Sequence, residues 1–117
     1  MMMRPATQED IQAYCSLPKS PTIRATAGEI DGKVVFLGGI AFSNGRWYAF
    51  VDLEDEARKH KFAVARAAIK FFRKARDSGI RYIYALPDLN EPSSIKWMTS
   101  LGFEPDMKTP GLFRWRG

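Results

Sequence analysis

The sequence predicts a mixed α/β domain built around one sheet of six or seven strands. Two turn pairs, Asp31-Gly32 and Asn44-Gly45, separate three strand-like runs and predict an antiparallel meander. A long stretch with apolar residues at spacings of three and four follows, which predicts a helix. A short apolar run comes after it, as in two parallel strands joined by a helix.

The chain begins with a predicted strand at Arg4–Thr7 and a short helix. Thr7 can cap this helix, because Asp10 follows three residues later as an acidic residue of the first turn. Ile11 and Tyr14 would form its inner face, and the prolines that follow end it.

The meander is expected to hold three strands, at Ile23–Ile30, Val34–Phe42 and Arg46–Leu53. Asp-Gly and Asn-Gly suit two-residue type I′ turns, because both central residues there need a positive φ. Gly38 and Gly39 inside the middle strand predict a bulge or a close approach of another backbone.

The long helix is expected from Glu56 to Asp77, with Gly79 as its stop. Its inner stripe would consist of Ala65, Ala68, Ile69, Phe72 and Ala75. The opposite, solvated face would consist of Arg66, Lys70, Arg73 and Asp77.

The last third is expected to add one strand, one helix and a strand pair. Arg81–Leu86 is a largely apolar run that suits a strand buried on both faces. Asn90 can cap a helix that stops at Gly102. Phe103–Pro105 and Leu112–Trp115 would form the last two strands.

The composition fits one globular domain that spans residues 1–117, since 45% of the residues are hydrophobic and 26% are charged. No apolar run reaches the roughly 20 residues of a membrane span, and the start lacks an apolar leader. We therefore expect a cytoplasmic protein without membrane contact. A single cysteine and a single histidine exclude an internal disulfide and a Cys/His zinc site, and no metal site is expected.

The net charge of +5 favours acidic partners. Eight Lys or Arg residues and no Asp or Glu occur between Arg58 and Arg76. One hypothesis is therefore a non-specific nucleic-acid-binding protein that uses this basic helix. Aromatic residues do not interleave with the basic face, so recognition of a specific nucleic acid is not expected.

With this order of elements the chain resembles the GCN5-related N-acetyltransferase (GNAT) family. "RPATQEDI" is similar to the family's first strand and helix entry, and "VDLEDEARKHKFAVARAAIKFF" to its strand, cofactor loop and long helix. "LNEPSSIKWMTSLGF" is similar to its later motif, in which an Asn-led helix ends in Gly-Phe. The resemblance covers nearly the whole chain. It implies a GNAT-like fold and acetyl transfer from acetyl-CoA to an acceptor amine that the sequence does not name.

The resemblance also implies where acetyl-CoA would lie. The opening would be between Arg46–Leu53 and Arg81–Leu86, with the pyrophosphate on backbone amides at the start of the long helix. In the family's loop pattern Arg58 matches the first position and Ala63 the last, whereas Lys61 replaces the middle glycine. The implied cofactor-binding residues are Arg58, Lys61, Phe62, Ala63, Val64 and Asn90.

The catalytic groups that the resemblance implies are incomplete. The family's general-acid tyrosine corresponds to Met98, which has no proton to donate. Tyr82 and Tyr84 lie elsewhere, on a strand expected in the core. Asp52, at the end of a strand beside the opening, is the candidate base for the amine.

Three functions stay open on the sequence. The first is an acetyl-CoA-dependent N-acetyltransferase with an altered cofactor loop and weak activity. The second is a catalytically silent structural or interaction protein, because short relatives of the GNAT family occur among phage and prophage proteins; the location would then be the virion. The third is the nucleic-acid binder. A homodimer and phage virion proteins are the protein partners considered.

Overall fold

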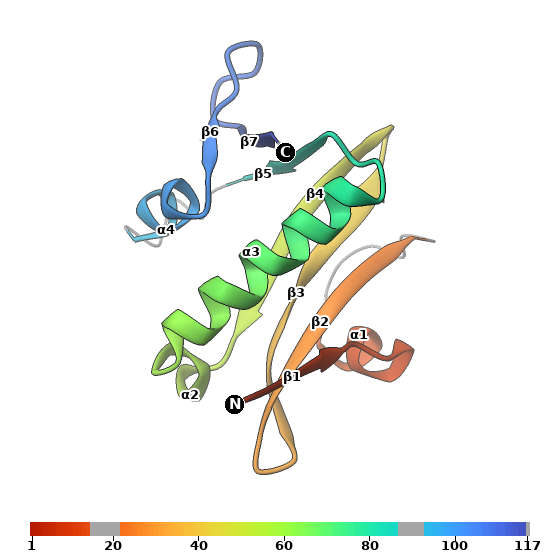
Figure 1. Ribbon diagram of the computed structural model, residues 1–117, viewed down its shortest axis with the longest axis vertical. Helices are drawn as coiled ribbons and strands as arrows, with labels where there is room; N and C mark the ends of the chain where they lie inside the picture. The colour runs from red at the N-terminus through yellow and green to blue at the C-terminus, as the bar shows by residue number, and fades with distance from the viewer. Residues whose placement is uncertain (15–21, 87–92, 117) are drawn as a thin grey trace.

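The computed structural model describes residues 1–14, 22–86 and 93–116, and it confirms the predicted mixed α/β fold. Seven strands form one sheet in the order β1-β2-β3-β4-β5-β7-β6 (Figure 1). The elements are β1 (Met2–Pro5), α1 (Gln8–Tyr14), β2 (Ile23–Ile30), β3 (Lys33–Ser43), β4 (Arg46–Leu53), α2 (Asp55–Arg58), α3 (Lys61–Asp77), β5 (Tyr82–Ala85), α4 (Ser94–Ser100), β6 (Phe103–Pro105) and β7 (Phe113–Arg116).

The antiparallel meander of β2, β3 and β4 is confirmed. Asp31 and Gly32 have φ of 51° and 79°, and Asn44 and Gly45 have the same pair of values, as type I′ turns require. The register of β3 against β4 runs without interruption from Phe36↔Leu53 to Ser43↔Arg46. Local turn chemistry therefore fixes this half of the sheet.

The glycine pair in β3 permits a close approach and not a bulge. A Cβ atom at Gly39 would lie 2.0 Å from the backbone oxygen of Arg24 on β2. The one register shift between β2 and β3 falls between Gly28 and Glu29 of β2. Of the two alternatives predicted for this glycine pair, the close approach is confirmed, because the crowding at Gly39 arises from the backbone of the neighbouring strand.

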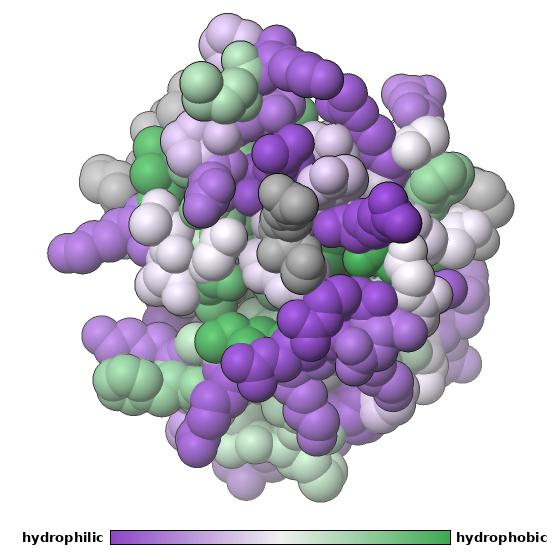
Figure 2. Space-filling view, turned by 45° about the horizontal axis from the view of Figure 1, so that its top comes forward, coloured by the Kyte–Doolittle hydropathy of each residue, from purple (hydrophilic) through white to green (hydrophobic). Residues whose placement is uncertain are grey.

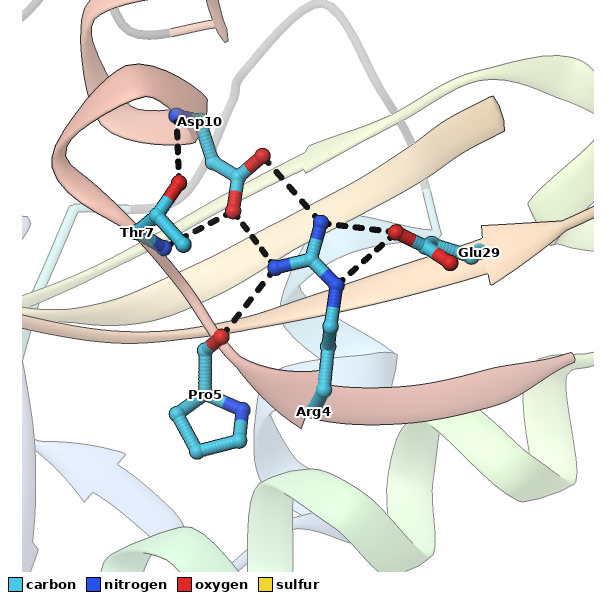
Figure 3. A network of polar contacts seen from close by, with 5 residues as sticks. All are labelled: Arg4, Pro5, Thr7, Asp10 and Glu29. Atoms are coloured by element: carbon cyan, nitrogen blue, oxygen red, sulfur yellow. Dashed lines mark hydrogen bonds and ion pairs between the residues drawn. The ribbon is translucent and has the colours of Figure 1, made fainter. Parts of the chain in front are cut away.

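The first strand begins two residues earlier than predicted and pairs with β2 at the edge of the sheet. Arg4 lies between two carboxylates, with its Nη1 2.6 Å from Asp10 Oδ2 and its Nε 2.8 Å from Glu29 Oε1 (Figure 3). The predicted cap is confirmed: the Asp10 N–H donates to Thr7 Oγ1, and the Thr7 N–H donates to the Asp10 carboxylate. Hydrogen bonds from Arg4 hold the pKa of Asp10 well below its usual value.

The long helix predicted from Glu56 to Asp77 is divided into α2 and α3. His60 has φ −110° and ψ 36°, which is outside the helical region and interrupts the helix before Lys61. Ala57 of α2 is fully buried beside Val64 and Phe36, so α2 is held against the sheet before α3 crosses it. Both segments consist of helix-forming residues, and so the sequence pattern could not mark the break.

The helices α3 and α4 cover one face of the sheet and share its main core (Figure 1). Phe72 of α3 packs its ring 5.5 Å from the rings of Phe103 and Trp115. The predicted inner stripe of α3 is buried or half-buried, whereas Arg66, Lys70 and Arg73 are exposed. Gly79, with φ 105°, ends the helix as predicted.

The strand β5 is buried on one face only, which corrects the prediction for Arg81–Leu86. Ile83 and Ala85 lie in the core beneath the helices. Tyr82 and Tyr84 alternate with them and therefore lie on the other face, where Tyr82 is 39% exposed. They are not core residues, because neither α3 nor α4 covers this face of β5.

Three predictions concern residues outside the described ranges: the cap at Asn90, the prolines that end α1, and Asn90 as a cofactor contact. None of the helices within the described ranges is long and apolar enough to cross a membrane. On the face drawn in Figure 2, hydrophobic residues form small separate patches among hydrophilic ones. That face carries no broad apolar surface.

Candidate active site

The candidate site begins where two parallel strands separate. β4 and β5 are neighbours, and a single register pair joins them, Tyr48↔Tyr84. β5 ends at Ala85, whereas β4 continues to Leu53 with its other edge fully paired to β3. In the described part of the chain, the backbone of Ala49–Leu53 therefore has no strand partner on the β5 side. An opening of this kind offers free backbone N–H and C=O groups to a ligand.

A cavity of about 320 Å³ lies at this opening and extends beneath α3 and α4. Its described lining is mainly apolar: Thr26, Phe36, Gly38, Gly39, Ala49, Phe50, Val51, Ala67, Ala68, Phe71, Phe72, Ala85, Leu86, Ser94, Trp97, Met98, Leu101 and Phe103. Val51 is 40% exposed and Leu86 is 72% exposed. Two apolar side chains thus remain accessible at the two strands that border the opening.

The start of α3 supplies a second feature of the site. In a first helical turn the amides of Lys61, Phe62 and Ala63 have no acceptor four residues back within the helix. The Val64 amide, which the resemblance implied as a cofactor contact, already donates to the His60 oxygen at 3.0 Å and is therefore not free for an anion. The Val64 side chain is also buried in the small core with Ala57. An anion could therefore use the three preceding amides and the positive end of the helix dipole.

The side chains at this helix start are strongly exposed. Phe62 is 76% exposed, and the Lys61 ammonium lies 5.8 Å from the centre of the Phe62 ring. Lys61 replaces the glycine of the family pattern, so its side chain adds both charge and bulk beside the free amides.

Acidic residues near this helix start are paired with bases. Lys33 Nζ lies 3.1 Å from Glu54 and 3.7 Å from Glu56, and the hydrogen bond with Glu54 raises the pKa of Lys33. Arg58 lies 3.6 Å from Asp55. These pairs reduce the repulsion that three carboxylates would exert on a diphosphate. The Arg58 guanidinium would therefore interact with Asp55 as well as with any bound ligand.

Asp52, the candidate base, lies on β4 opposite Leu37 of β3. Its side chain alternates with that of Val51, so it projects from the sheet face opposite α3 and α4. Partial loss of hydration raises the pKa of this carboxyl above its ordinary value, although the residue as a whole is exposed. A raised pKa makes the carboxylate a better proton acceptor.

Met98, at the position of the family's tyrosine, is 6% exposed and lines the cavity. The register pair Tyr48 and Tyr84 instead places two phenol rings at the narrow end of the opening, with centroids 6.1 Å apart. Sequence reasoning missed this pair, because the register between two distant strands leaves no local signal. Within the described residues, no group of three His, Cys, Asp or Glu side chains could hold a metal ion.

No protein-family model matches the sequence, and no curated protein matches it. Solved structures do match over nearly the whole chain. The ribosomal-protein-S18-alanine N-acetyltransferase from Escherichia coli superimposes with a TM-score of 0.68 at 10% identity, over 98% of this chain and 92% of that one. The chain has the N-acetyltransferase fold.

Two further structures share this fold. An N-acetyltransferase from Staphylococcus aureus Mu50 has a TM-score of 0.68 at 15% identity, over 98% of this chain and 97% of that one. A mutant AtaT toxin bound to the C-terminus of the antitoxin AtaR and acetyl-CoA has a TM-score of 0.59 at 12% identity, over 98% and 92% of the two chains. At these identities the comparisons establish the fold.

Proposed function

We propose that this protein is an acetyl-CoA-dependent N-acetyltransferase with an altered cofactor loop and slow turnover. The observation that carries the proposal is the opening between β4 and β5, which are parallel, adjacent and joined by one register pair. The apolar cavity fits the pantetheine arm, and the free amides of Lys61, Phe62 and Ala63 fit the diphosphate. A solved structure of the same fold contains acetyl-CoA, which supports the choice of cofactor.

Acetyl-CoA would supply the acetyl thioester. The unpaired N–H groups of β4 would donate a hydrogen bond to its carbonyl oxygen and favour attack by an amine. Asp52 would take the proton that the attacking amine loses. Met98 provides no proton for the thiolate, so the sulfur would be protonated from solvent and the reaction would be slow.

The experiment begins with a calorimetric titration of the purified protein with acetyl-CoA. We expect loose binding by the wild type, because Lys61 attracts the diphosphate but obstructs its approach. Lys61→Gly is expected to tighten binding about tenfold, or about 1.4 kcal/mol. Lys59→Gly removes the same charge from a neighbouring exposed position and serves as the matched control. Equal effects of the two variants would assign the change to charge alone.

Turnover is tested with Met98→Tyr in the Lys61→Gly background. A tyrosine hydroxyl at this position in the cavity is expected to raise acetyl transfer to a model amine by about 10²-fold. Met98→Phe supplies the ring without the hydroxyl and should leave the rate unchanged. If both substitutions raise the rate equally, the hydroxyl is not a proton donor.

The alternative is a catalytically silent GNAT-fold protein, including a phage or prophage structural protein. The buried Met98 and the lysine in the loop favour this alternative. It becomes the better account if neither the wild type nor Lys61→Gly binds acetyl-CoA at millimolar concentration.

A further inference from the structure

One group of side chains on the face of the sheet opposite α3 and α4 has no role in the proposed reaction. We call it the tyrosine–arginine strip, and it consists of Arg46, Tyr48, Tyr82, Tyr84 and Arg114. Three adjacent strands contribute to it, in the spatial order β4, β5 and β7. It is separate from the basic outer face of α3, which lies above the opposite face of the sheet (Figure 1).

The register of the sheet aligns the strip. Tyr48 of β4 stands beside Tyr84 of β5, and Tyr84 stands beside Arg114 of β7. Adjacent strands lie about 4.8 Å apart, so the row across three strands is about 10 Å wide. Arg46 and Tyr82 precede Tyr48 and Tyr84 by two residues and project from the same face.

The planar groups of the strip contact one another. The Arg46 guanidinium lies 4.7 Å from the centre of the Tyr84 ring. The Arg114 guanidinium lies 5.0 Å from the centre of the Tyr82 ring. Arg–aromatic contacts of this kind hold the guanidinium groups in place. Tyr82 is 39% exposed and Arg46 is exposed, so the strip is accessible from solvent.

The strip carries two positively charged arginines, and one of them is paired with an acidic residue. Among the described residues Arg46 forms no ion pair with a carboxylate, whereas Arg114 lies 3.9 Å from Asp106. Asp52 and Glu104 lie at the margins of the same face. Arg46 therefore remains available to a phosphate, and the acidic residues near Arg114 limit the positive surface to a narrow strip.

We propose that the tyrosine–arginine strip binds single-stranded nucleic acid without strong sequence preference. Unpaired bases stack on tyrosine rings and guanidinium planes whatever their sequence. Phosphates between the bases accept hydrogen bonds from the arginines. A narrow row of rings suits two or three unstacked bases and does not suit a duplex, whose bases are already stacked. This binding is independent of acetyl transfer.

The test uses fluorescence anisotropy with a labelled 12-nucleotide RNA of mixed sequence and with the duplex of the same sequence. The wild type is expected to bind the single strand more tightly than the duplex. Arg46→Gln should reduce the slope of log affinity against log salt by about 0.7, the value for one phosphate contact on a single strand. Arg66→Gln removes the same charge from the outer face of α3 and should leave the slope unchanged.

A second pair of variants tests stacking. Tyr82→Leu keeps an apolar side chain but removes the ring, and it should weaken binding by about tenfold. Tyr82→Phe keeps the ring and should bind like the wild type, and thermal melts will show that both variants fold. The proposal is overturned if the wild type does not bind the RNA, if the duplex binds equally well, or if Arg66→Gln reduces the slope as much as Arg46→Gln. Equal binding of a polyglutamate peptide would overturn it as well, since such a surface would recognise charge alone.

Discussion

The two edges of β4 differ in how many of their residues pair with a neighbouring strand. Along β3 every residue from Arg46 to Leu53 has a register partner, and Glu54 adds one more hydrogen bond, to Val35. On the β5 side, Tyr48 alone has a register partner within the described ranges. The same strand thus completes the antiparallel half of the sheet on one side and leaves a ligand-sized opening on the other.

This difference shows that the second half of the sheet is held mainly by side chains. β5, β7 and β6 pair well with one another, but only Tyr48↔Tyr84 joins them to the first half. The core beneath α3 and α4 spans both halves, since it contains Ile40 of β3 as well as Ile83 of β5. Substitutions in the core, or where β4 and β2 pair with β3, should therefore destabilise the fold. Substitutions along the unpaired edge of β4 that faces β5, the open edge, should alter binding.

The largest expected effect is that of Phe72→Ala. The Phe72 ring packs against Phe103 of β6 and Trp115 of β7, and so it holds these two strands against α3. We expect a loss of about 3–5 kcal/mol in the free energy of unfolding, measured by denaturant melts. Lys70→Ala on the exposed face of α3 should change stability by less than about 0.5 kcal/mol. Equal losses would mean that α3 does not join the two halves.

The antiparallel half of the sheet is tested by Gly39→Ala. The added Cβ would lie 2.0 Å from the Arg24 oxygen, so β2 and β3 must move apart. We expect destabilisation of about 3 kcal/mol in the same melts. Gly32→Ala, at a turn with φ 79° and no atom near the added Cβ, should cost about 1 kcal/mol and is the control for backbone strain alone.

The far edge of the sheet is tested by pH. Because Arg4 lowers the pKa of Asp10, this ion pair contributes its full stability above the unfolded pKa of about 4. The contribution is lost as the pH falls below that value toward the folded pKa. Asp10→Asn keeps an N3 acceptor but removes the charge, so its stability should vary less between pH 4 and pH 2 than that of the wild type. If the stability of the wild type and of Asp10→Asn depended on pH in the same way, the ion pair would not contribute to stability.

The smallest effect on stability is expected at the open edge. Val51→Thr should change the free energy of unfolding by less than about 0.5 kcal/mol, because the side chain is 40% exposed. It should weaken acetyl-CoA binding about fourfold, because the burial of one methyl group changes an affinity by about this factor. Met107→Thr alters an apolar residue that is 94% exposed on another loop and should leave the affinity unchanged.

Local signals predicted much of the fold. Asp31-Gly32, Asn44-Gly45 and Gly79 set the turns and the helix end, because each acts through its own backbone conformation. The break at His60 and the exposed face of β5 were missed, because both depend on what packs against the segment. Burial of Ala57 beside Val64 causes the first, and the position of Tyr82 on the face opposite α3 and α4 causes the second.

The candidate site was predicted less completely. The resemblance placed the cofactor loop at Arg58–Ala63 and the opening between β4 and β5, but the predicted long helix began at Glu56 and not at Lys61. It gave no indication that Lys33 pairs with Glu54, or that Tyr48 stands beside Tyr84. Such contacts join residues that are far apart in the sequence, and only the register of the sheet brings them together.

The central claim is that the unpaired edge of β4 receives the cofactor. The direct test is to follow the backbone amides of the ¹⁵N-labelled protein by NMR during a titration with acetyl-CoA. We predict that the amides of Ala49–Leu53 and of Lys61–Ala63 shift in one saturable process, while those of β1 and α1 at the far edge of the sheet stay in place. No shift at millimolar acetyl-CoA, or shifts confined to another surface, would contradict the account.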